Sequence, residues 1–174
     1  MIYTSSYYSP VGKILIASKN NRLIGLWIEG QKYFPQNLKE KVQNKDSEEI
    51  LVKTKKWLEK YFNKEKPEIT ELELEPIGGE FRKRVWKILC EIPYGKVITY
   101  GEIARRVARE TNKKSMSAQA IGGAVSHNPI SIIIPCHRVV GSNGNLTGYA
   151  GGIDKKIKLL ELEGVNINNF HLPK

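Results

Sequence analysis

The sequence lacks the residues and segments on which several protein classes depend. It holds two cysteines, Cys90 and Cys136, and three histidines in 174 residues. Two cysteines cannot form a disulfide framework, and their spacing to the histidines does not match a zinc site, so we expect no metal and no cofactor. No stretch approaches the roughly 18 consecutive apolar residues of a membrane span, and residues 1–9 do not resemble a secretion signal. We therefore expect a cytoplasmic protein with no membrane partner.

Charge is distributed unevenly along the chain. The formal net charge is +10, and the hydrophobic fraction of 40% is enough to fill a core. Residues 1–76 carry 13 lysines and arginines against 11 acidic residues, whereas residues 77–174 carry 15 against 7. A basic excess favours a polyanionic partner, with nucleic acid first among them. The alternative is a lysine-rich surface that only serves solubility.

Three short segments near the start of the chain alternate apolar and polar residues, which is the pattern of strands that bury one face. They cover residues 2–8, 13–18 and 23–29. Turn-forming residues separate them, which predicts an antiparallel meander. A helix is expected next, because apolar residues over 50–62 fall on one helical face and Asp46 has capping-box spacing to Glu49. This pattern is typical of a small α/β domain.

A pair of glycines, Gly78 and Gly79, follows a charged segment and marks the expected hinge. We therefore expect two domains, an N-terminal α/β domain over residues 1–76 and a second domain over residues 77–174.

Short helices are expected to dominate the second domain. After a helix over residues 80–91, Thr99 and Glu102 form a capping box that begins another helix. A third helix follows within SAQAIGGAVSHNP, residues 117–129. Two short basic helices in tandem are typical of a helix-turn-helix. Tyr100 lies in the first turn of its helix, where free amide groups favour a phosphate.

The third helix contains adjacent glycines, Gly122 and Gly123, each of which costs roughly 1 kcal/mol relative to alanine. Its larger apolar residues are expected to pack inward. This leaves a smooth outer strip of small residues, namely Ala120, Gly123 and Ala124. One explanation is tight packing against a neighbouring helix. The other is close approach to a narrow groove of DNA, where Gln119 could enter between the bases.

Cys136 follows a hydrophobic segment and directly precedes His137 and Arg138. A buried structural cysteine is the default interpretation of such a position. A nucleophile must be a thiolate, and since a free thiol has a pKa of about 8.5, a base or a positive charge must lie nearby. His137 is a candidate base if a turn brings it beside the sulfur, and Glu161 or Glu163 could hold its imidazole in the working tautomer. The residues predict an activated nucleophile without naming its substrate.

The second domain resembles the O6-alkylguanine-DNA alkyltransferases, which are suicide DNA-repair proteins. The resemblance covers residues 81–164 and rests on four segments: GGA at 122–124, NP at 128–129, PCHRV at 135–139 and GYAGG at 148–152. It implies an RNase H-like α/β domain followed by a winged helix-turn-helix domain that carries the active site. It also implies that a damaged nucleotide is flipped out of double-stranded DNA and that its alkyl group moves irreversibly to the cysteine.

The resemblance assigns roles to individual residues. Cys136 would accept the alkyl group, His137 would be its water-mediated base, and Glu163 would orient the histidine. Tyr100 would rotate the target phosphate and donate a hydrogen bond to the leaving guanine. Contacts to DNA or to the substrate are expected from Gln119, Ala120, Gly123, Ala124, Asn128, Arg138, Val139, Tyr149, Ala150 and Gly151.

Gln119 departs from the family pattern, which often has an arginine there to fill the gap left by the flipped base. Glutamine can still hydrogen-bond the orphaned partner base, but it lacks the charge and the stacking surface of a guanidinium. We expect weaker extrusion of undamaged bases rather than loss of activity. Within the expected contacts, Asn128 would brace the turn after the recognition helix and Arg138 would be mainly structural.

The substrate implied by the resemblance is O6-alkylguanine in double-stranded DNA, with O4-alkylthymine as a further candidate. A monomer that needs no cofactor is expected. The alternative is a non-catalytic helix-turn-helix protein that binds alkyl lesions or DNA, although such a protein would not need Cys136. A cysteine hydrolase is disfavoured because no oxyanion-hole motif is present.

Overall fold

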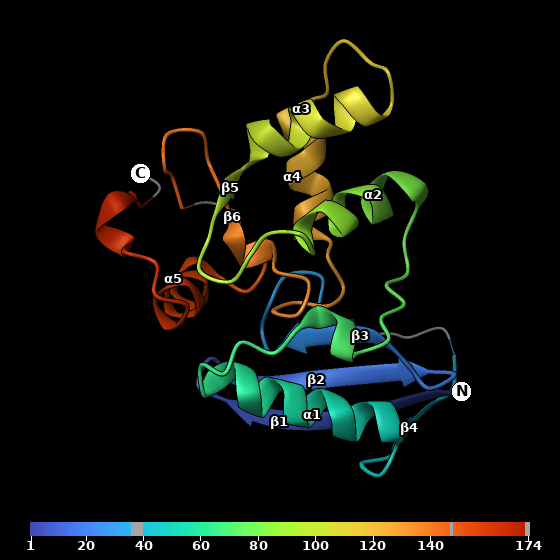
Figure 1. Cartoon of the computed structure of the whole chain (residues 1–174). Helices are drawn as coiled ribbons and strands as arrows, with labels where there is room; N and C mark the ends of the chain where they lie inside the picture. The colour runs from blue at the N-terminus through green and yellow to red at the C-terminus, as the bar shows by residue number, and fades with distance from the viewer. Residues whose placement is uncertain (36–39, 147, 173–174) are drawn as a thin grey trace. The chain divides into compact units, whose positions relative to one another are not determined.

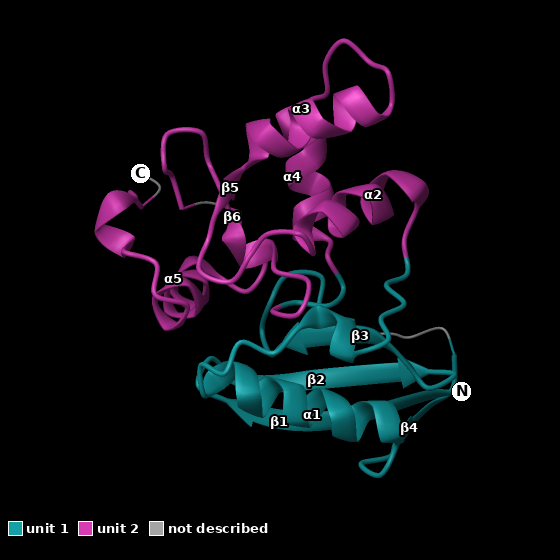
Figure 2. Ribbon diagram, in the orientation of Figure 1, with its two compact units in different colours: residues 1–77, 129–131 teal, residues 78–128, 132–174 magenta. Residues whose placement is uncertain are grey.

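The computed structural model of the chain, which describes residues 1–35, 40–146 and 148–172, divides into two compact units (Figure 1, Figure 2). The first unit comprises residues 1–77 and 129–131, and the second comprises residues 78–128 and 132–174. The sequence pattern gave no reason to place residues 129–131 in the first unit. They pair with a strand there, because the Leu26 N–H donates to the Pro129 carbonyl (2.8 Å) and the Ser131 N–H donates to the Leu26 carbonyl (3.0 Å).

The first unit is a four-stranded sheet with one long helix packed on it (Figure 1). Strands β1 (Ile2–Ser9), β2 (Gly12–Lys19) and β3 (Arg22–Ile28) form the antiparallel meander that the alternating pattern predicts. A short strand, β4 (Val42–Asn44), adds parallel to β1, so the strand order is β3-β2-β1-β4. Helix α1 (Glu49–Phe62) covers the three long strands and buries its apolar face against them. This core makes the unit an α/β layer pair.

The start of α1 differs from the expected capping box. Asp46 is not the N-cap residue, because its carboxylate accepts a hydrogen bond from the Ser5 hydroxyl of β1. Glu48 takes the N-cap position without a capping side chain. The Ile50 N–H in the first turn instead donates to Asn21 Oδ1 at 3.2 Å. The expectation for Asp46 was therefore wrong, since a side chain distant in sequence took its place.

The second unit consists of short helices and one small parallel strand pair. Its elements are α2 (Glu80–Leu89), β5 (Ile98–Thr99), α3 (Tyr100–Glu110), α4 (Ala118–Ser126), β6 (Val139–Val140) and α5 (Ile153–Leu162). Helices α2, α3 and α4 pack on one another, and β5 pairs with β6. The capping box of α3 is confirmed, because the Glu102 N–H donates to Thr99 Oγ1 (3.0 Å) and the Thr99 N–H donates to Glu102 Oε2 (3.2 Å).

The described residues also form three single 3₁₀ turns, namely η1 (Ile69–Glu71), η2 (Cys136–Arg138) and η3 (Ile167–Asn169). After η3, His171 pairs with the turn that follows β6. The Leu146 N–H donates to the His171 carbonyl (2.8 Å), and the His171 N–H donates to the Gly144 carbonyl (3.0 Å). Across the described part of the chain, no helix combines the length and the apolar character that crossing a bilayer requires.

Trp86 joins α2 to α4 in the core of the second unit. The residue is 2% exposed, and its Nε1–H donates to the Ala124 carbonyl at 2.8 Å. A Cβ added at Gly78 would lie 2.5 Å from this ring, so the first glycine of the expected hinge is also required by packing. The indole therefore fixes where α4 lies relative to α2.

We expect Trp86→Phe to lower the free energy of unfolding by about 1–3 kcal/mol, because the buried Ala124 carbonyl loses its donor from α2. Denaturant unfolding of the full chain measures this change. A midpoint equal to that of the unaltered chain, with the same slope, would show that this hydrogen bond contributes nothing.

Candidate active site

Cys136 begins the 3₁₀ turn η2 directly after a buried apolar segment. Residues 132–134 are at most 1% exposed, and Pro135 is the N-cap of the turn. The Arg138 N–H donates to the Pro135 carbonyl at 3.0 Å, and all three residues of the turn are buried. In a strand, Cys136 and His137 would point to opposite faces. Because the two residues lie in a turn and not in a strand, their side chains are not forced to opposite faces.

The His137 ring is held by Glu163, the C-cap residue of α5. His137 Nε2 and Glu163 Oε2 are 2.6 Å apart. Arg138 donates from Nε to Oε1 at 2.7 Å and from Nη2 to Oε2 at 3.1 Å, and the Gly95 N–H donates to Oε1 at 3.0 Å. One carboxylate thus accepts hydrogen bonds from three residues. Of the two candidate carboxylates, Glu163 takes this place, whereas Glu161 is exposed.

The charges of this pair follow from its surroundings. Burial alone would raise the pKa of Glu163, but the hydrogen bonds and charges of His137 and Arg138 hold the pKa of that carboxyl well below its usual range. Burial lowers the pKa of His137 and outweighs the attraction of Glu163. A neutral imidazole that donates Nε2–H to the carboxylate carries its acceptor lone pair on Nδ1. The geometry therefore favours a histidine that can take up a proton through Nδ1.

The surroundings of the Cys136 thiol act on its pKa in opposite directions. Burial raises its pKa, while a hydrogen bond from the Asn128 side chain and the positive charge of Lys156 act to lower it. Asn128 Nδ2 also donates to the Ile134 carbonyl at 2.8 Å. Asn128 thereby ties the end of α4 to the segment that enters the cysteine turn.

Lys156 is a residue of this site that the sequence analysis missed. Its side chain is fully buried, and Nζ donates to the Val139 carbonyl. Burial lowers the pKa of Lys156 to about 8, although the nearby Cys136 sulfur opposes this shift. A signal was available, because Lys156, Leu160 and Glu163 have the spacing of one helix face. A helical projection of α5 would have placed this lysine inward.

Two tyrosines lie near the cysteine. Burial raises the pKa of Tyr100 to about 12 and that of Tyr149 well above its usual value, and negative charge at Cys136 raises both further. The Tyr149 ring packs edge to face with His137, with centroids 6.4 Å apart. Its hydroxyl is buried and has no hydrogen-bond partner among the described residues. A Cβ added at Gly148 would lie 2.6 Å from the Tyr100 hydroxyl, so only glycine fits at position 148.

Helix α4 exposes a narrower strip than expected. Gln119 and Ala120 are exposed and Gly123 is partly exposed, but Ala124 is only 1% exposed. The expectation that Ala124 lies on the outer strip is wrong, because its side of the helix packs toward Trp86. Ala124 is therefore a core residue and is not available for contact with DNA.

The adjacent glycines of α4 do not lie against another helix. A Cβ added at Gly122 or Gly123 would meet no atom within 4 Å. Of the two explanations for these glycines, packing on a neighbouring helix therefore has no support. Ser117 caps the same helix and accepts from the N–H groups of Gln119 (3.1 Å) and Ala120 (3.3 Å).

Of the remaining predicted site residues, some are buried and others are partly exposed. The Arg138 side chain points into the protein, since Nη1 donates to the Ile92 carbonyl at 2.7 Å in addition to the hydrogen bonds that the side chain donates to Glu163. Val139 is buried, and its N–H donates to the Cys136 carbonyl. Ala150 and Gly151 are partly exposed before α5. No cluster of three or more histidine, cysteine or acidic side chains that could hold a metal ion occurs among the described residues.

Both parts of the chain match one family of proteins. Residues 2–76 match the family described as 6-O-methylguanine DNA methyltransferase, ribonuclease-like domain, and residues 80–165 match its DNA binding domain. A methylated-DNA–protein-cysteine methyltransferase of Methanosarcina acetivorans is 44% identical over 168 residues, which cover 94% of this chain and 99% of that protein. One from Haemophilus influenzae is 40% identical over 164 residues, covering 94% and 87%.

Solved structures agree with the sequence matches. The crystal structure of Mycobacterium tuberculosis OGT in complex with DNA has a TM-score of 0.80 at 36% identity, and covers 97% of this chain and 94% of that one. A second structure, the O6-methylguanine methyltransferase of the same organism, has a TM-score of 0.78 at 39% identity, covering 94% and 93%. A ribonuclease-like α/β part is thus joined to a helical DNA-binding part that bears a buried cysteine. The chain belongs to the 6-O-methylguanine DNA methyltransferase family, which confirms the predicted family and fold class.

The buried neutral His137 predicts a loss of stability in mild acid. The unfolded histidine protonates with a pKa of about 6.5, whereas folded His137 has a lowered pKa and stays neutral to lower pH. The stabilisation of the fold by neutral His137 is therefore complete at pH values above the unfolded pKa of about 6.5. It declines as the pH falls from there toward the lower pKa of folded His137. We expect urea unfolding at several pH values to show this decline, and we expect His137→Gln to remove it. An NMR titration with a His137 midpoint above that of a free histidine would contradict the prediction.

Proposed function

We propose that Cys136 is the residue to which this DNA-repair protein transfers the methyl group of O6-methylguanine. The observation that carries the proposal is the 2.6 Å contact between His137 Nε2 and Glu163 Oε2 next to a buried cysteine. The family acts by methyl transfer from DNA to a protein cysteine, and Cys136 alone has a histidine–carboxylate pair beside it among the described cysteines. The partner is DNA, and the proposed lesion is O6-alkylguanine in a duplex bound by a monomer.

The proposed chemistry begins with the thiol proton. Because burial disfavours the thiolate, a base must take this proton, and His137 accepts it on Nδ1 through an intervening water. Glu163 stabilises the imidazolium that forms. The positive charge of Lys156 and the hydrogen bond from Asn128 stabilise the thiolate. The sulfur is thus activated only while these groups surround it.

The thiolate then attacks the methyl carbon of the lesion. A sulfur–carbon bond forms as the bond between that carbon and guanine O6 breaks, and the electron pair remains on the guanine. Tyr100 stabilises the departing guanine by donating its O–H, which its raised pKa keeps protonated at neutral pH. The exchange balances because the proton that left the thiol for His137 finally replaces the methyl group on the guanine, which leaves as a neutral base. The thioether that remains on Cys136 has no leaving group that water can displace at neutral pH, so each molecule acts once.

The exposed side of α4 supports a role in extracting the damaged nucleotide. Its small residues leave open space at Gly122 and Gly123, which allows the close approach to a DNA groove that a larger side chain would obstruct. Gln119 projects from the first turn of this helix and is exposed. We assign to Gln119 the filling of the space that a flipped nucleotide leaves, at an unstacking cost of a few kcal/mol.

Reaction with a duplex oligonucleotide that contains one O6-methylguanine tests the acceptor residue. Intact mass spectrometry is expected to show the gain of one methyl group per chain, and peptide mapping is expected to locate it on Cys136. Cys136→Ser should give no adduct. Cys90→Ser should react normally, since burial and the neighbouring Glu91 raise the pKa of the Cys90 thiol to about 11 and so keep it protonated at neutral pH. An adduct on Cys90, or none on the unaltered chain, would refute the assignment.

Substitution of Gln119 tests its proposed place in the DNA duplex. Gln119→Arg is expected to bind duplex DNA several-fold more tightly, because a guanidinium adds both charge and a stacking surface. Gln119→Lys adds only the charge and should have an intermediate effect. Titration of labelled duplex at one fixed salt concentration measures all three affinities. Equal or weaker binding by Gln119→Arg would argue that this side chain does not enter the duplex.

A further inference from the structure

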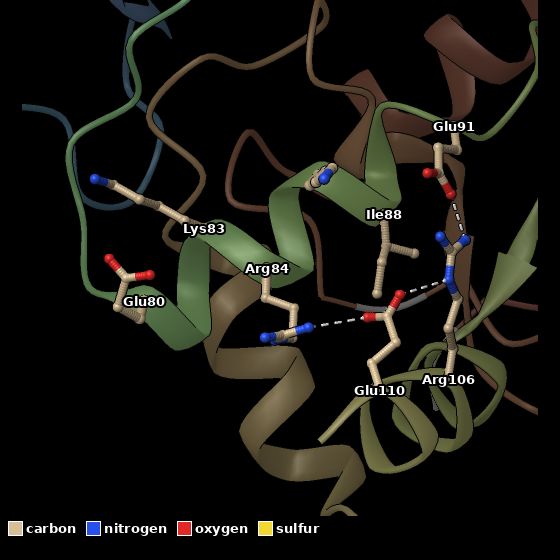
Figure 3. Close-up of a pocket in the computed structure, with 8 residues that line it drawn as sticks. Glu80, Lys83, Arg84, Ile88, Glu91, Arg106 and Glu110 are labelled. Carbon is tan, nitrogen blue, oxygen red and sulfur yellow. Dashed lines mark hydrogen bonds and ion pairs between the residues drawn. The ribbon is translucent and has the colours of Figure 1, made fainter. Parts of the chain in front are cut away.

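Helix α3 carries arginines on two sides, and the two sides differ in how their charge is balanced. On one side, Arg106 forms ion pairs with Glu91 and with Glu110, the latter at 3.4 Å from its Nε (Figure 3). Arg84 of α2 reaches the same Glu110 at 3.4 Å. The charges in this pocket between α2 and α3 are largely neutralised within the protein, so it has little excess charge to offer a partner.

The other side of α3 holds a groove whose charge is not balanced. The groove has a volume of about 440 Å³ and is lined by Arg105, Arg109, Lys113 and Lys114, with no acidic residue in its lining. All four side chains are exposed, and none of them forms an ion pair with an acidic side chain of the described residues. We call these four residues and the space between them the basic groove. Four adjacent cations without counter-charges attract a polyanion.

The backbone explains how two separate segments supply the four cations. Arg105 and Arg109 are one helical turn apart on α3. After this helix, Asn112 adopts a left-handed conformation with φ of 55°, and the Lys113 N–H donates back to the Ala108 carbonyl at 2.8 Å. This return places Lys113 and Lys114 beside the arginines instead of extending them away from the helix.

The groove begins next to the proposed active site. Arg105 lies over Gly101, since a Cβ added to this glycine would be 3.5 Å from Arg105 Nη1. Gly101 directly follows Tyr100, whose hydroxyl lies near Cys136. From Gly101 to Arg109 the helix rises about 12 Å. A strand of B-DNA carries one phosphate for roughly every 3.4 Å of helix axis, so the row spans about three phosphates.

Apart from Ser115 and Met116, the lining between the cations consists of small apolar residues. Gly101, Ala104, Ala108 and Ala118 contribute no long side chain to the groove. A sugar-phosphate strand presents charged oxygens and apolar sugar faces, and it therefore matches cations set around a small apolar lining. An acidic peptide would also bring backbone N–H groups that need acceptors, and no carboxylate lines the groove.

We propose that the basic groove binds the sugar-phosphate backbone of one DNA strand next to the damaged nucleotide, extending the interface along α3. This inference rests on the proposed function, since it places the strand relative to Tyr100 and Cys136. The groove contributes affinity that is independent of sequence and of the lesion, because backbone contacts position a protein without reading bases.

The salt dependence of binding to an undamaged duplex tests the groove. Each phosphate contact contributes about 0.9 to the slope of log affinity against log salt. A variant that combines Arg105→Gln, Arg109→Gln, Lys113→Gln and Lys114→Gln is expected to reduce the steepness of that slope by about 3, because about three phosphates lose their contacts. The side chains are exposed, so the fold should tolerate the change, and thermal unfolding of each variant verifies this. Arg105→Lys with Arg109→Lys should keep the slope, because the charges remain.

The neutralised side of α3 provides the matched control. Arg84→Gln and Arg106→Gln remove the same kind of charge from the same region, and both should leave the slope unchanged. If the four-residue variant keeps the slope of the unaltered chain, or if the control variants reduce it equally, the groove does not bind the strand. A loss for single-stranded RNA alone, with duplex binding unaffected, would overturn the proposal in favour of a different polyanion.

The two proposals fail in different measurements. Binding of an undamaged duplex requires no reaction, so the slope reports on the groove even if no methyl group is transferred. Conversely, the adduct on Cys136 of the unaltered chain reports on the chemistry even if the slope is unaffected by the groove residues.

Discussion

A single buried carboxylate, that of Glu163, determines the arrangement of the second unit around the cysteine. An unpaired charge in the interior would cost several kcal/mol, so it persists only where partners compensate it. Arg138 and His137 of the cysteine turn and the Gly95 amide, which lies about 40 residues earlier in the sequence, supply that compensation. The same contacts that stabilise the charge also fix the imidazole in one orientation. The stability of the cysteine turn and the reactivity that we propose for Cys136 therefore depend on one set of hydrogen bonds.

Features that depend on neighbouring residues could be predicted from the sequence. The alternating pattern located the three long strands, and the Thr99–Glu102 pair located the start of α3. The short segment around Cys136 predicted a histidine held by a carboxylate of the closing helix, either Glu161 or Glu163, and only the family resemblance selected Glu163. The family resemblance then added the substrate, which the residue types alone did not indicate.

Features that depend on contacts between distant segments could not be predicted in this way. Asp46 bonds to Ser5 of β1 instead of capping α1, since tertiary hydrogen bonds compete with local ones. Ala124 is buried because Trp86 packs on its side of α4, and one turn of a short helix does not reveal which face is covered. Lys156 was missed because a lysine is presumed to be exposed. Its burial becomes understandable only when the Val139 carbonyl and the Cys136 sulfur are seen beside it.

The contact between His137 and Glu163 also has a consequence for the newly made chain. The two residues are separated by 26 positions, and Lys156 likewise follows the cysteine in the sequence. At a synthesis rate of about 5–20 residues per second, Cys136 exists for roughly one to five seconds before its carboxylate is made. During that interval the thiol has no oriented base and no neighbouring ammonium group. Until helix α5 is made, the thiol of a nascent chain therefore lacks the two side chains, Lys156 and Glu163, that the folded protein places around the cysteine turn.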